Sequence, residues 1–582
     1  MRIALLAFAL VLSAANPVLA DDAALNRLIA DYEVFWLRES PGTAAQLGDR
    51  SALSRLPDVS VAGDVRRKAA LEAFRARLSA TPTGDLSDGA KLNHAFLAWV
   101  LEGSLAEIAF DDAAMPFSSD GGFDRSLNYG ASTVPMRSAA DATAWIAKLE
   151  AAPIYWRDSV ANARRGVKRG FTQPRTTVEA VLKEARAAAA RPIDGDPLLA
   201  PLSRLPASIP AAEQAMLQAR GRAAVDVIRP LQRDYAAFLE REYLPAARKA
   251  LGARTLPGGE AYYRRLVREH TTSDLTPDQI HQIGQTEVAR IRAEMAGVMA
   301  ETRFQGDLPA FLAMLRTEPR FYATSREALL KEASEIAKRI DDQLPAWFAT
   351  LPRLTYGVRP VPREIEAGYT TGRYFSGSPA QGRAGGYMVN TGALDQRALY
   401  ELPALTLHEA VPGHHLQIAL SQELTDVPAF RREAGVTAFT EGWGLYAEKL
   451  GGEMGIYRDP YERFGRLSYE MWRACRLVAD TGLHWKGWSL EQARACFTEN
   501  TALSPLNIEV ELARYVSWPG QALAYKIGEM KHVELRERAR AALGPRFDIR
   551  RYHDAVLLAG PLPLSLLEAR IDGWIATERA KR

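Results

Sequence analysis

The sequence predicts a mainly α-helical protein with a small β element. Long stretches are rich in Ala, Leu, Arg and Glu, and their apolar residues recur three and four positions apart, as on one face of a helix. Segments with strand character are few. With 582 residues and 47% hydrophobic content, the chain is long enough to bury more than one core-sized unit.

The N-terminus has the pattern of a signal peptide at residues 1–20. Arg2 supplies a positive charge, an apolar run covers residues 3–15, and Val18-Leu19-Ala20 precedes the acidic Asp21. The apolar run is shorter than the roughly 20 residues of a membrane span, and no later segment qualifies as one. We expect an exported protein, periplasmic or extracellular, with no membrane span in the mature chain.

Export places the chain in an oxidising compartment, where its two cysteines, Cys475 and Cys496, can form a disulfide. Two buried free thiols are an equal alternative, because the distance between the cysteines is not readable from sequence.

In chain order, helical periodicity is clearest over residues 64–78, 177–190, 212–251 and 277–302. Residues 191–210 contain five prolines and little periodicity, which indicates a long loop or a boundary. We therefore divide the mature chain into an N-terminal helical region, 21–210, and a second helical region, 211–582, which contains the histidine cluster described below. The best strand candidate covers residues 385–391 and follows a Gly- and Ser-rich approach.

The charge balance gives no indication of nucleic-acid or anionic-membrane binding. Lys and Arg total 73 and Asp and Glu total 70, so the formal charge of +3 is spread over a large surface. Partners must be inferred from individual sites.

Three of the nine histidines fall within the segment His408-Glu-Ala-Val-Pro-Gly-His-His415. A histidine followed by a glutamate, with a second histidine one turn later, is typical of a helix that binds catalytic zinc. The two imidazoles hold Zn²⁺ and the glutamate, here Glu409, activates water. The usual spacing is four residues, but Pro412 stands there, and the next histidines follow six and seven residues after His408.

An undistorted helix cannot bring either later histidine to the same ion. At about 100° and 1.5 Å per residue, His414 points about 240° away from His408, and His415 lies about 10.5 Å along the axis. Pro412 and Gly413 predict a widened or broken turn between the ligands. If the turn absorbs two residues His414 is the ligand, and if it absorbs three His415 is. We favour His414, which leaves His415 to support a ligand or face the substrate.

A catalytic zinc ion has three protein ligands and an open position, so a third ligand is expected downstream. Glu441 and Glu448 lie seven residues apart on one predicted helix face. We assign Glu441 as the ligand and Glu448 as a side chain that supports one of the ligands. Without the histidine cluster, either glutamate is an ordinary solvated carboxylate.

The two motifs, His408 to His415 and Glu441-Gly-Trp-Gly-Leu-Tyr-Ala-Glu448, resemble those of a widespread bacterial family catalogued as a domain of unknown function. That family is similar to helical zinc peptidases with a glutamate ligand, such as thimet-type oligopeptidases, angiotensin-converting-type dipeptidases and thermostable bacterial carboxypeptidases. The resemblance covers nearly the whole mature chain. It implies two helical halves around a deep active-site cleft with zinc on its floor.

The resemblance also implies substrate contacts. In such peptidases the substrate backbone pairs with an edge strand beside the metal, which here implies residues 385–391, including Tyr387 and Asn390. An ordinary structural hairpin is the alternative.

A Tyr of the relatives that donates to the oxyanion corresponds to Tyr525, whereas Gln521 stands where they have a second tyrosine. Arg514 and Lys526 are candidates for binding a substrate carboxylate, with structural salt bridges as the alternative. His484 is a further candidate, although a satisfied core histidine is the simpler interpretation.

Together these residues predict a zinc metallopeptidase that cleaves oligopeptides. Zinc lowers the pKa of water toward about 7, and Glu409 takes the proton and passes it to the leaving amine. No Gly-x-Ser-x-Gly elbow supports a nucleophilic enzyme. The alternatives are an inactive exported zinc-binding or scaffold protein and a hydrolase of non-peptide amides.

Overall fold

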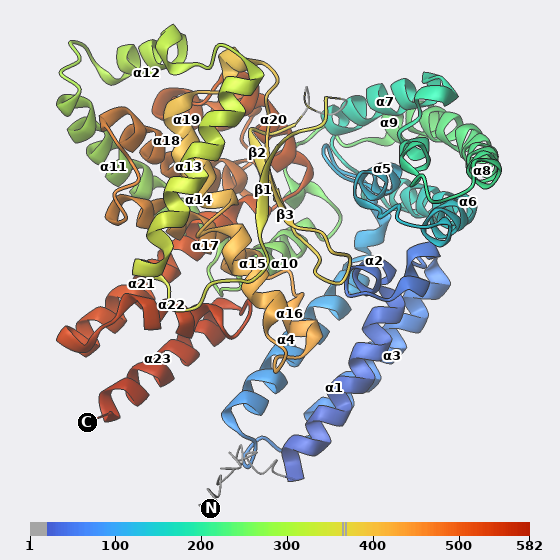
Figure 1. The fold of residues 1–582 in the computed structure, drawn as a ribbon, viewed down its shortest axis with the longest axis horizontal. Helices are drawn as coiled ribbons and strands as arrows, with labels where there is room; N and C mark the ends of the chain where they lie inside the picture. The colour runs from blue at the N-terminus through green and yellow to red at the C-terminus, as the bar shows by residue number, and fades with distance from the viewer. Residues whose placement is uncertain (1–19, 364–365, 367–368, 582) are drawn as a thin grey trace, which may run out of the picture.

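The computed structural model describes residues 20–363, 366 and 369–581, so the predicted signal peptide lies, except for Ala20, outside the described residues. The fold is mainly α-helical with one small sheet, as predicted (Figure 1). The α-helices are α1 (Ala20–Glu39), α2 (Pro41–Gln46), α3 (Val61–Ser79), α4 (Asp88–Phe110), α5 (Phe123–Thr133), α6 (Ala139–Arg169), α7 (Arg175–Ala190), α8 (Ala211–Phe238), α9 (Leu244–Ala246), α10 (Gly259–Thr271), α11 (Pro277–Glu301), α12 (Leu308–Thr317), α13 (Arg326–Trp347), α14 (Leu402–Glu409), α15 (His414–Glu423), α16 (Ala429–Arg432), α17 (Thr437–Glu453), α18 (Pro460–Thr481), α19 (Leu490–Asn500), α20 (Pro505–Ser517), α21 (Ala524–Leu543), α22 (Ile549–Leu557) and α23 (Leu564–Ala580).

The predicted helices correspond to α3, α7, α8–α9 and α11, and residues 191–210 contain only 3-10 helix, as their prolines indicate. The third helix ends earlier than predicted, at Ala246 rather than at residue 251. Beyond it, the guanidinium of Arg248 donates to the carbonyls of Thr172, Leu251 and Gly252, which holds the chain in an extended turn. A side chain that binds distant carbonyls overrides local helix propensity.

The sheet has three strands, β1 (Tyr356–Pro360), β2 (Gly372–Phe375) and β3 (Gly385–Val389), in the order β1-β3-β2. β3 is parallel to β1 and antiparallel to β2. The predicted strand at 385–391 is therefore present, but it is the central strand. The expectation that it offers a free edge to a substrate is wrong, because both of its sides are occupied by neighbouring strands.

Two large hydrophobic cores hold the helices together. The larger one joins side chains of α1, α3 and α4 with those of α11 to α23, and the second is formed mainly by α5 to α8. Figure 1 shows the helices α5 to α9 grouped beside the rest of the molecule, with the strands between the two groups. Side chains from both sides of residue 210 share the second core. The division of the chain at this residue stays a prediction.

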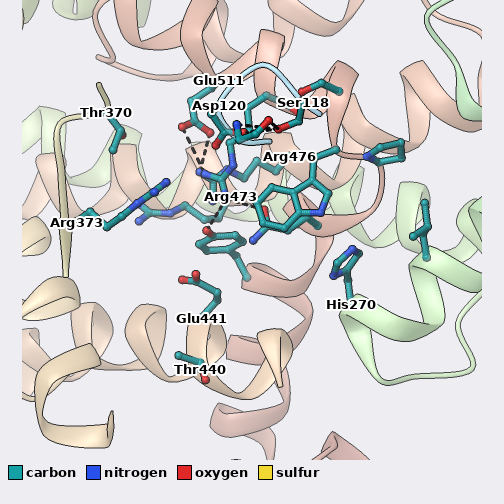
Figure 2. A pocket seen from close by; sticks show the side chains of 18 of the residues that line it. Ser118, Asp120, His270, Thr370, Arg373, Thr440, Glu441, Arg473, Arg476 and Glu511 are labelled. Carbon is teal, nitrogen blue, oxygen red and sulfur yellow. Dashed lines mark hydrogen bonds and ion pairs between the residues drawn. The ribbon is translucent and has the colours of Figure 1, made fainter. Parts of the chain in front are cut away.

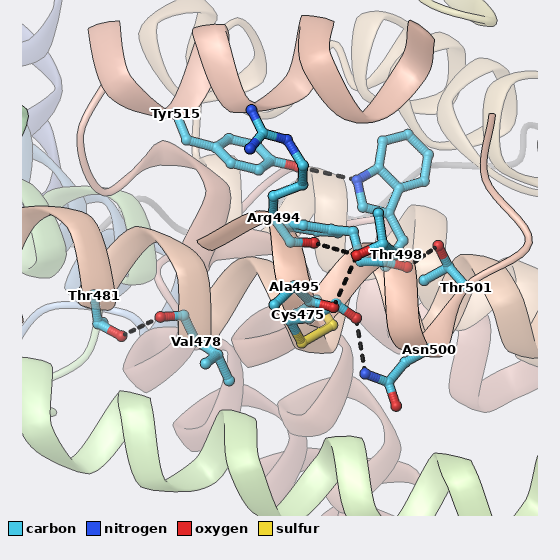
Figure 3. Close-up of a disulfide and its surroundings, with 12 residues drawn as sticks. Cys475, Val478, Thr481, Arg494, Ala495, Thr498, Asn500, Thr501 and Tyr515 are labelled. Atoms are coloured by element: carbon cyan, nitrogen blue, oxygen red, sulfur yellow. Dashed lines mark hydrogen bonds between the residues drawn. A yellow bond between two sulfur atoms is a disulfide. The ribbon is translucent and has the colours of Figure 1, made fainter. Parts of the chain in front are cut away.

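Cys475 of α18 and Cys496 of α19 form a disulfide, with Cα atoms 5.7 Å apart (Figure 3). Of the two alternatives left open by the sequence, the structure has the paired one. A disulfide that closes a loop as long as the segment between these two cysteines stabilises the fold by about 3 kcal/mol in the chain-entropy view. It also links α18, a helix that borders the candidate site, covalently to α19. In the part of the chain that the structure describes, no helix is both long and apolar enough to cross a membrane.

Candidate metal centre

The helix carrying His408 stops just after it, and a new helix starts at His414. α14 ends at Glu409 and α15 begins at His414, so the predicted break between the histidines is present. Gly413 is required in the break, because a Cβ there would lie 2.0 Å from the carbonyl oxygen of His408. Its N–H donates to the Leu407 carbonyl at 3.0 Å, which closes the chain tightly around the turn.

This break brings His414 to the same point as His408 and Glu441. The Nε2 atoms of His408 and His414 each lie 3.4 Å from Glu441 Oε2. Ligand atoms from all three residues lie within 4.8 Å of one another. A tetrahedral zinc ion with ligand distances of about 2.0 to 2.1 Å holds its ligand atoms about 3.3 Å apart. The spacing therefore suits a small tetrahedral cation.

An unsatisfied atom of the cluster also fits a cation. Glu441 Oε2, which faces both Nε2 atoms, is buried and has no hydrogen-bond partner in the described chain. A buried carboxylate oxygen without a partner costs free energy, which coordination of a cation removes. Two imidazoles and one carboxylate are the protein ligands of many catalytic zinc sites.

The charges of the cluster are strongly coupled. Burial acts to lower the pKa of His408, but contacts with Glu441 and Glu448 outweigh it and raise this pKa to about 10. Burial likewise acts to raise the pKa of Glu441, yet the neighbouring His414 and His408 hold it well below its usual value. Without a metal, His408 carries a proton at neutral pH, and a bound cation takes the place of that proton.

Residues of α17 and α18 hold the ring of His408 in its orientation. Its Nδ1 lies 2.8 Å from Glu448 Oε1, and the same oxygen forms an ion pair with Arg473 Nη2 at 3.1 Å. Because Nδ1 is engaged, Nε2 is the atom that faces Glu441. Gly444 of α17 leaves room for the ring, since a Cβ at this position would meet it at 2.6 Å. The structure thus places Glu448 in the supporting position that the sequence predicts for it.

Glu409 lies beside the three residues without joining them. Its Oε2 is 4.0 Å from His414 Nε2 and accepts a 2.7 Å hydrogen bond from the backbone N–H of Tyr374 in β2. A carboxylate fixed next to a metal position, but not aimed at the same point as the ligands, is suitably placed to accept a proton from water.

The cluster opens into a cleft of about 850 Å³ (Figure 2). Six predicted site residues line it, namely His408, Glu409, His414, Glu441, Arg514 and Tyr525. The ring of Tyr525 stacks near that of His408, with centroids 6.5 Å apart, and its hydroxyl accepts from Arg514 Nη2 at 3.1 Å. Gln521 also lines the cleft and accepts from Arg514 at 2.7 Å. β2 borders the cleft through Gly372, Arg373 and Tyr374.

Four predicted substrate-binding residues are placed away from the cleft, which corrects their assignment. Tyr387 is fully buried against Thr406, and the Asn390 amide donates to three carbonyls of the preceding loop. Thr406 belongs to α14, so Tyr387 lies on the face of β3 that packs against this helix, and Asn390 follows directly after the strand.

His415 is also turned away from the cluster. Its Nδ1 lies 3.0 Å from the Tyr374 hydroxyl and its Nε2 3.0 Å from the Leu354 carbonyl, so both nitrogens are used. Lys526 is buried among Glu287, Glu470 and Glu529, with its Nζ 2.7 to 3.0 Å from their carboxylates. It therefore forms structural ion pairs, the alternative to binding a substrate carboxylate. A side chain with all its polar atoms engaged in buried contacts has none left for a substrate.

His484 is a satisfied core histidine. Its Nδ1 accepts from the N–H of Ala253 at 3.0 Å and its Nε2 lies 2.8 Å from the Tyr515 carbonyl. Burial lowers its pKa to about 3, so the ring stays neutral.

Three arginines in the cleft were missed by sequence reasoning: Arg373 of β2 and Arg473 and Arg476 of α18. The two on α18 are three residues apart and so share a helix face, which was the only available signal. Arginines at this spacing are common on solvated helices, so the pattern alone does not indicate a site.

Comparisons with known proteins give a family and a fold. A family model described as "Bacterial protein of unknown function (DUF885)" matches residues 41–571. A crystal structure described as that of "the putative lipoprotein from Colwellia psychrerythraea" is 27% identical, with a TM-score of 0.90, and covers 96% of this chain and 100% of its own. A structure of "a putative lipoprotein of unknown function from Shewanella oneidensis" is 19% identical, with a TM-score of 0.69 over 95% of this chain and 99% of its own, a likeness of fold alone. No curated protein matches the chain.

Proposed function

We propose that this chain, which belongs to the DUF885 family of bacterial proteins of unknown function, is an exported zinc-dependent peptidase that hydrolyses oligopeptides. The observation that carries the proposal is the meeting of His408 Nε2, His414 Nε2 and Glu441 Oε2 at the spacing of a tetrahedral ion, on the wall of a large cleft. Three protein ligands leave an open position, which is typical of catalytic rather than structural zinc.

The mechanism assigns one task to each residue. His408, His414 and Glu441 would hold the zinc ion, which would supply Lewis-acid activation of water and of the scissile carbonyl. Glu409, held by the Tyr374 N–H, accepts the proton of the attacking water and delivers it to the leaving amine. The Tyr525 hydroxyl, held by Arg514, donates to the developing oxyanion. No covalent intermediate with the protein is involved.

The substrate backbone adds to β2, not to β3. β2 is an outer strand of the sheet and contributes Gly372, Arg373 and Tyr374 to the cleft. An extended peptide that pairs with this edge gains main-chain hydrogen bonds regardless of its side chains, from groups other than the Tyr374 N–H, which donates to Glu409. This arrangement suits a peptidase, because it orients the peptide bond beside Glu409.

Two observations support export. The chain forms a disulfide, as expected in an oxidising compartment, and the two similar solved structures are described as putative lipoproteins. The proposed signal at residues 1–20 agrees with both.

The proposal is tested by metal analysis and by digestion of a mixed peptide library with and without added zinc, followed by mass spectrometry. We expect one zinc ion per chain, cleavage of peptides that depends on zinc, and loss of cleavage in Glu409→Gln. Bound zinc with no hydrolysis of any amide would instead identify a binding or scaffold protein. Hydrolysis of non-peptide amides but not of peptides would identify an amidohydrolase.

A further inference from the structure

Three arginine side chains line the cleft that also contains Tyr525. They belong to Arg373 of β2, Arg476 of α18 and Arg514 of α20, here called the arginine cluster. Figure 2 shows Arg373 pointing from its strand toward Arg476 and Glu511, with Glu441 below them. Nothing in the proposed hydrolysis step requires three positive charges at this place.

The hydrogen bonding of the cluster is incomplete. Arg476 is only 2% exposed; its Nη2 meets Glu511 at 2.8 Å and its Nε donates to the Tyr515 hydroxyl at 2.8 Å, yet its Nη1 has no partner among the described residues. Arg514 Nε is likewise without one. Over the same described part of the chain, the side chain of Arg373 forms no hydrogen bond or ion pair and only approaches the Tyr369 ring, at 5.6 Å. Such donors on the wall of a cleft are suited to a ligand with acceptor atoms.

The positive charges of the arginine cluster outnumber the carboxylates beside it by one. Glu511 pairs with Arg476, and Asp120 acts electrostatically on both Arg373 and Arg514. Three guanidinium groups against two carboxylates match a ligand with a single negative charge. Planar guanidinium groups bind carboxylates through two parallel hydrogen bonds, which favours this anion.

Among the groups that every linear oligopeptide carries, only the C-terminal carboxylate is an anion. The N-terminal ammonium would be repelled by the cluster. We propose that the arginine cluster binds the C-terminal carboxylate of the substrate, so that the enzyme takes peptides with a free C-terminus. This inference rests on the proposed peptidase function and adds its substrate class.

The position of the cluster also sets where the peptide is cut. Arg476 Cζ lies 4.1 Å from the Tyr525 ring centroid, and that ring is 6.5 Å from the ring of His408. One aromatic side chain thus separates the Arg476 guanidinium from the His408 ring. An extended peptide advances about 3.3 to 3.6 Å per residue, so the scissile bond lies about one to three residues from the C-terminus. The products are short C-terminal pieces.

The test measures peptide binding to the zinc-loaded Glu409→Gln protein by calorimetry. Three versions of one peptide are compared: the free acid, the C-terminal amide, and an amide whose last residue is glutamate. We expect the acid to bind about 10 to 100-fold more tightly than the plain amide, the range for hydrogen bonds to charged groups. The glutamate amide, whose carboxylate is on a side chain, should not recover this difference.

Arg373→Gln is the diagnostic variant, because it removes one positive charge and no internal hydrogen bond. It should bring the affinity for the acid down toward that for the amide. Arg359→Gln is the matched control: Arg359 is exposed on β1 and pairs with the same residue of β3, Met388, as Arg373 does on β2. The control should keep the full preference for the acid.

Each outcome is decisive. Equal binding of acid and amide, or a glutamate amide that binds as well as the acid, overturns the inference and leaves the peptidase proposal intact. An unchanged preference in Arg373→Gln overturns the role of the cluster. Absence of binding by any peptide overturns both proposals. Cleavage one to three residues from free C-termini, and loss of this cleavage on amidation, supports the inference for the native enzyme.

Discussion

Gly444 is predicted to be essential for metal binding, although it has no side chain to offer a ligand. A Cβ at this position of α17 would lie 2.6, 2.8 and 2.9 Å from Cε1, Nδ1 and Nε2 of His408. Non-bonded heavy atoms prefer separations of about 3.5 to 4.0 Å. In Gly444→Ala the His408 ring must therefore move by about 1 Å, which also strains its 2.8 Å hydrogen bond to Glu448.

A displacement of about 1 Å exceeds the roughly 0.2 Å within which a metal ligand must be placed. We expect the zinc affinity of Gly444→Ala to fall at least about 100-fold, more than the 10 to 100-fold loss typical of removing a supporting residue. The affinity is measured by competition with a chromogenic chelator. Circular dichroism and denaturant unfolding of the metal-free protein separate this loss from a loss of folding.

Gly452→Ala provides the control on the same helix. A Cβ there meets nothing within 4 Å, so the variant should bind zinc like the wild type. It should also be more stable by about 0.5 to 1 kcal/mol, since alanine restricts the unfolded chain more than glycine does. A folded Gly444→Ala protein with wild-type zinc affinity would refute the placement of His408 as a ligand.

Three further predictions concern the catalytic base, the ligand choice and a buried carboxyl group. Glu409→Gln should keep one zinc ion per chain by metal analysis while activity falls by several orders of magnitude; retained activity would contradict its role as base. His414→Ala should lose zinc, whereas His415→Ala should keep it and unfold at a lower temperature; the reverse result would show that His415 is the ligand. Burial raises the pKa of Asp480 from 3.8 to about 7, so its stabilising protonated form is lost as pH rises through this range. Relative to Asp480→Asn, the unfolding free energy of the wild type should fall by about 1.4 kcal/mol per pH unit between about pH 5 and 6.5. If the unfolding free energies of the two proteins changed with pH in parallel, this prediction would be contradicted.

Much of the fold was predictable because helices depend on residues close in sequence. Apolar spacing of three and four placed α3, α7 and α11, and the prolines of 191–210 marked a segment without α-helix. The break at Pro412-Gly413 was also local, since a proline and a glycine act on the backbone of their own turn. Whether two or three residues were absorbed was not decided by that turn.

The sequence by itself determined the mainly helical fold and the short motif that holds His408, Glu409 and His414. Only the tertiary structure decided that His414 rather than His415 faces Glu441, that β2 rather than β3 is the outer strand, and that Lys526 is enclosed by glutamates. It also brought together the arginines of β2, α18 and α20. The physical reason is that backbone hydrogen bonding and periodicity operate over a few residues, whereas the direction of a side chain depends on packing between elements far apart in the chain.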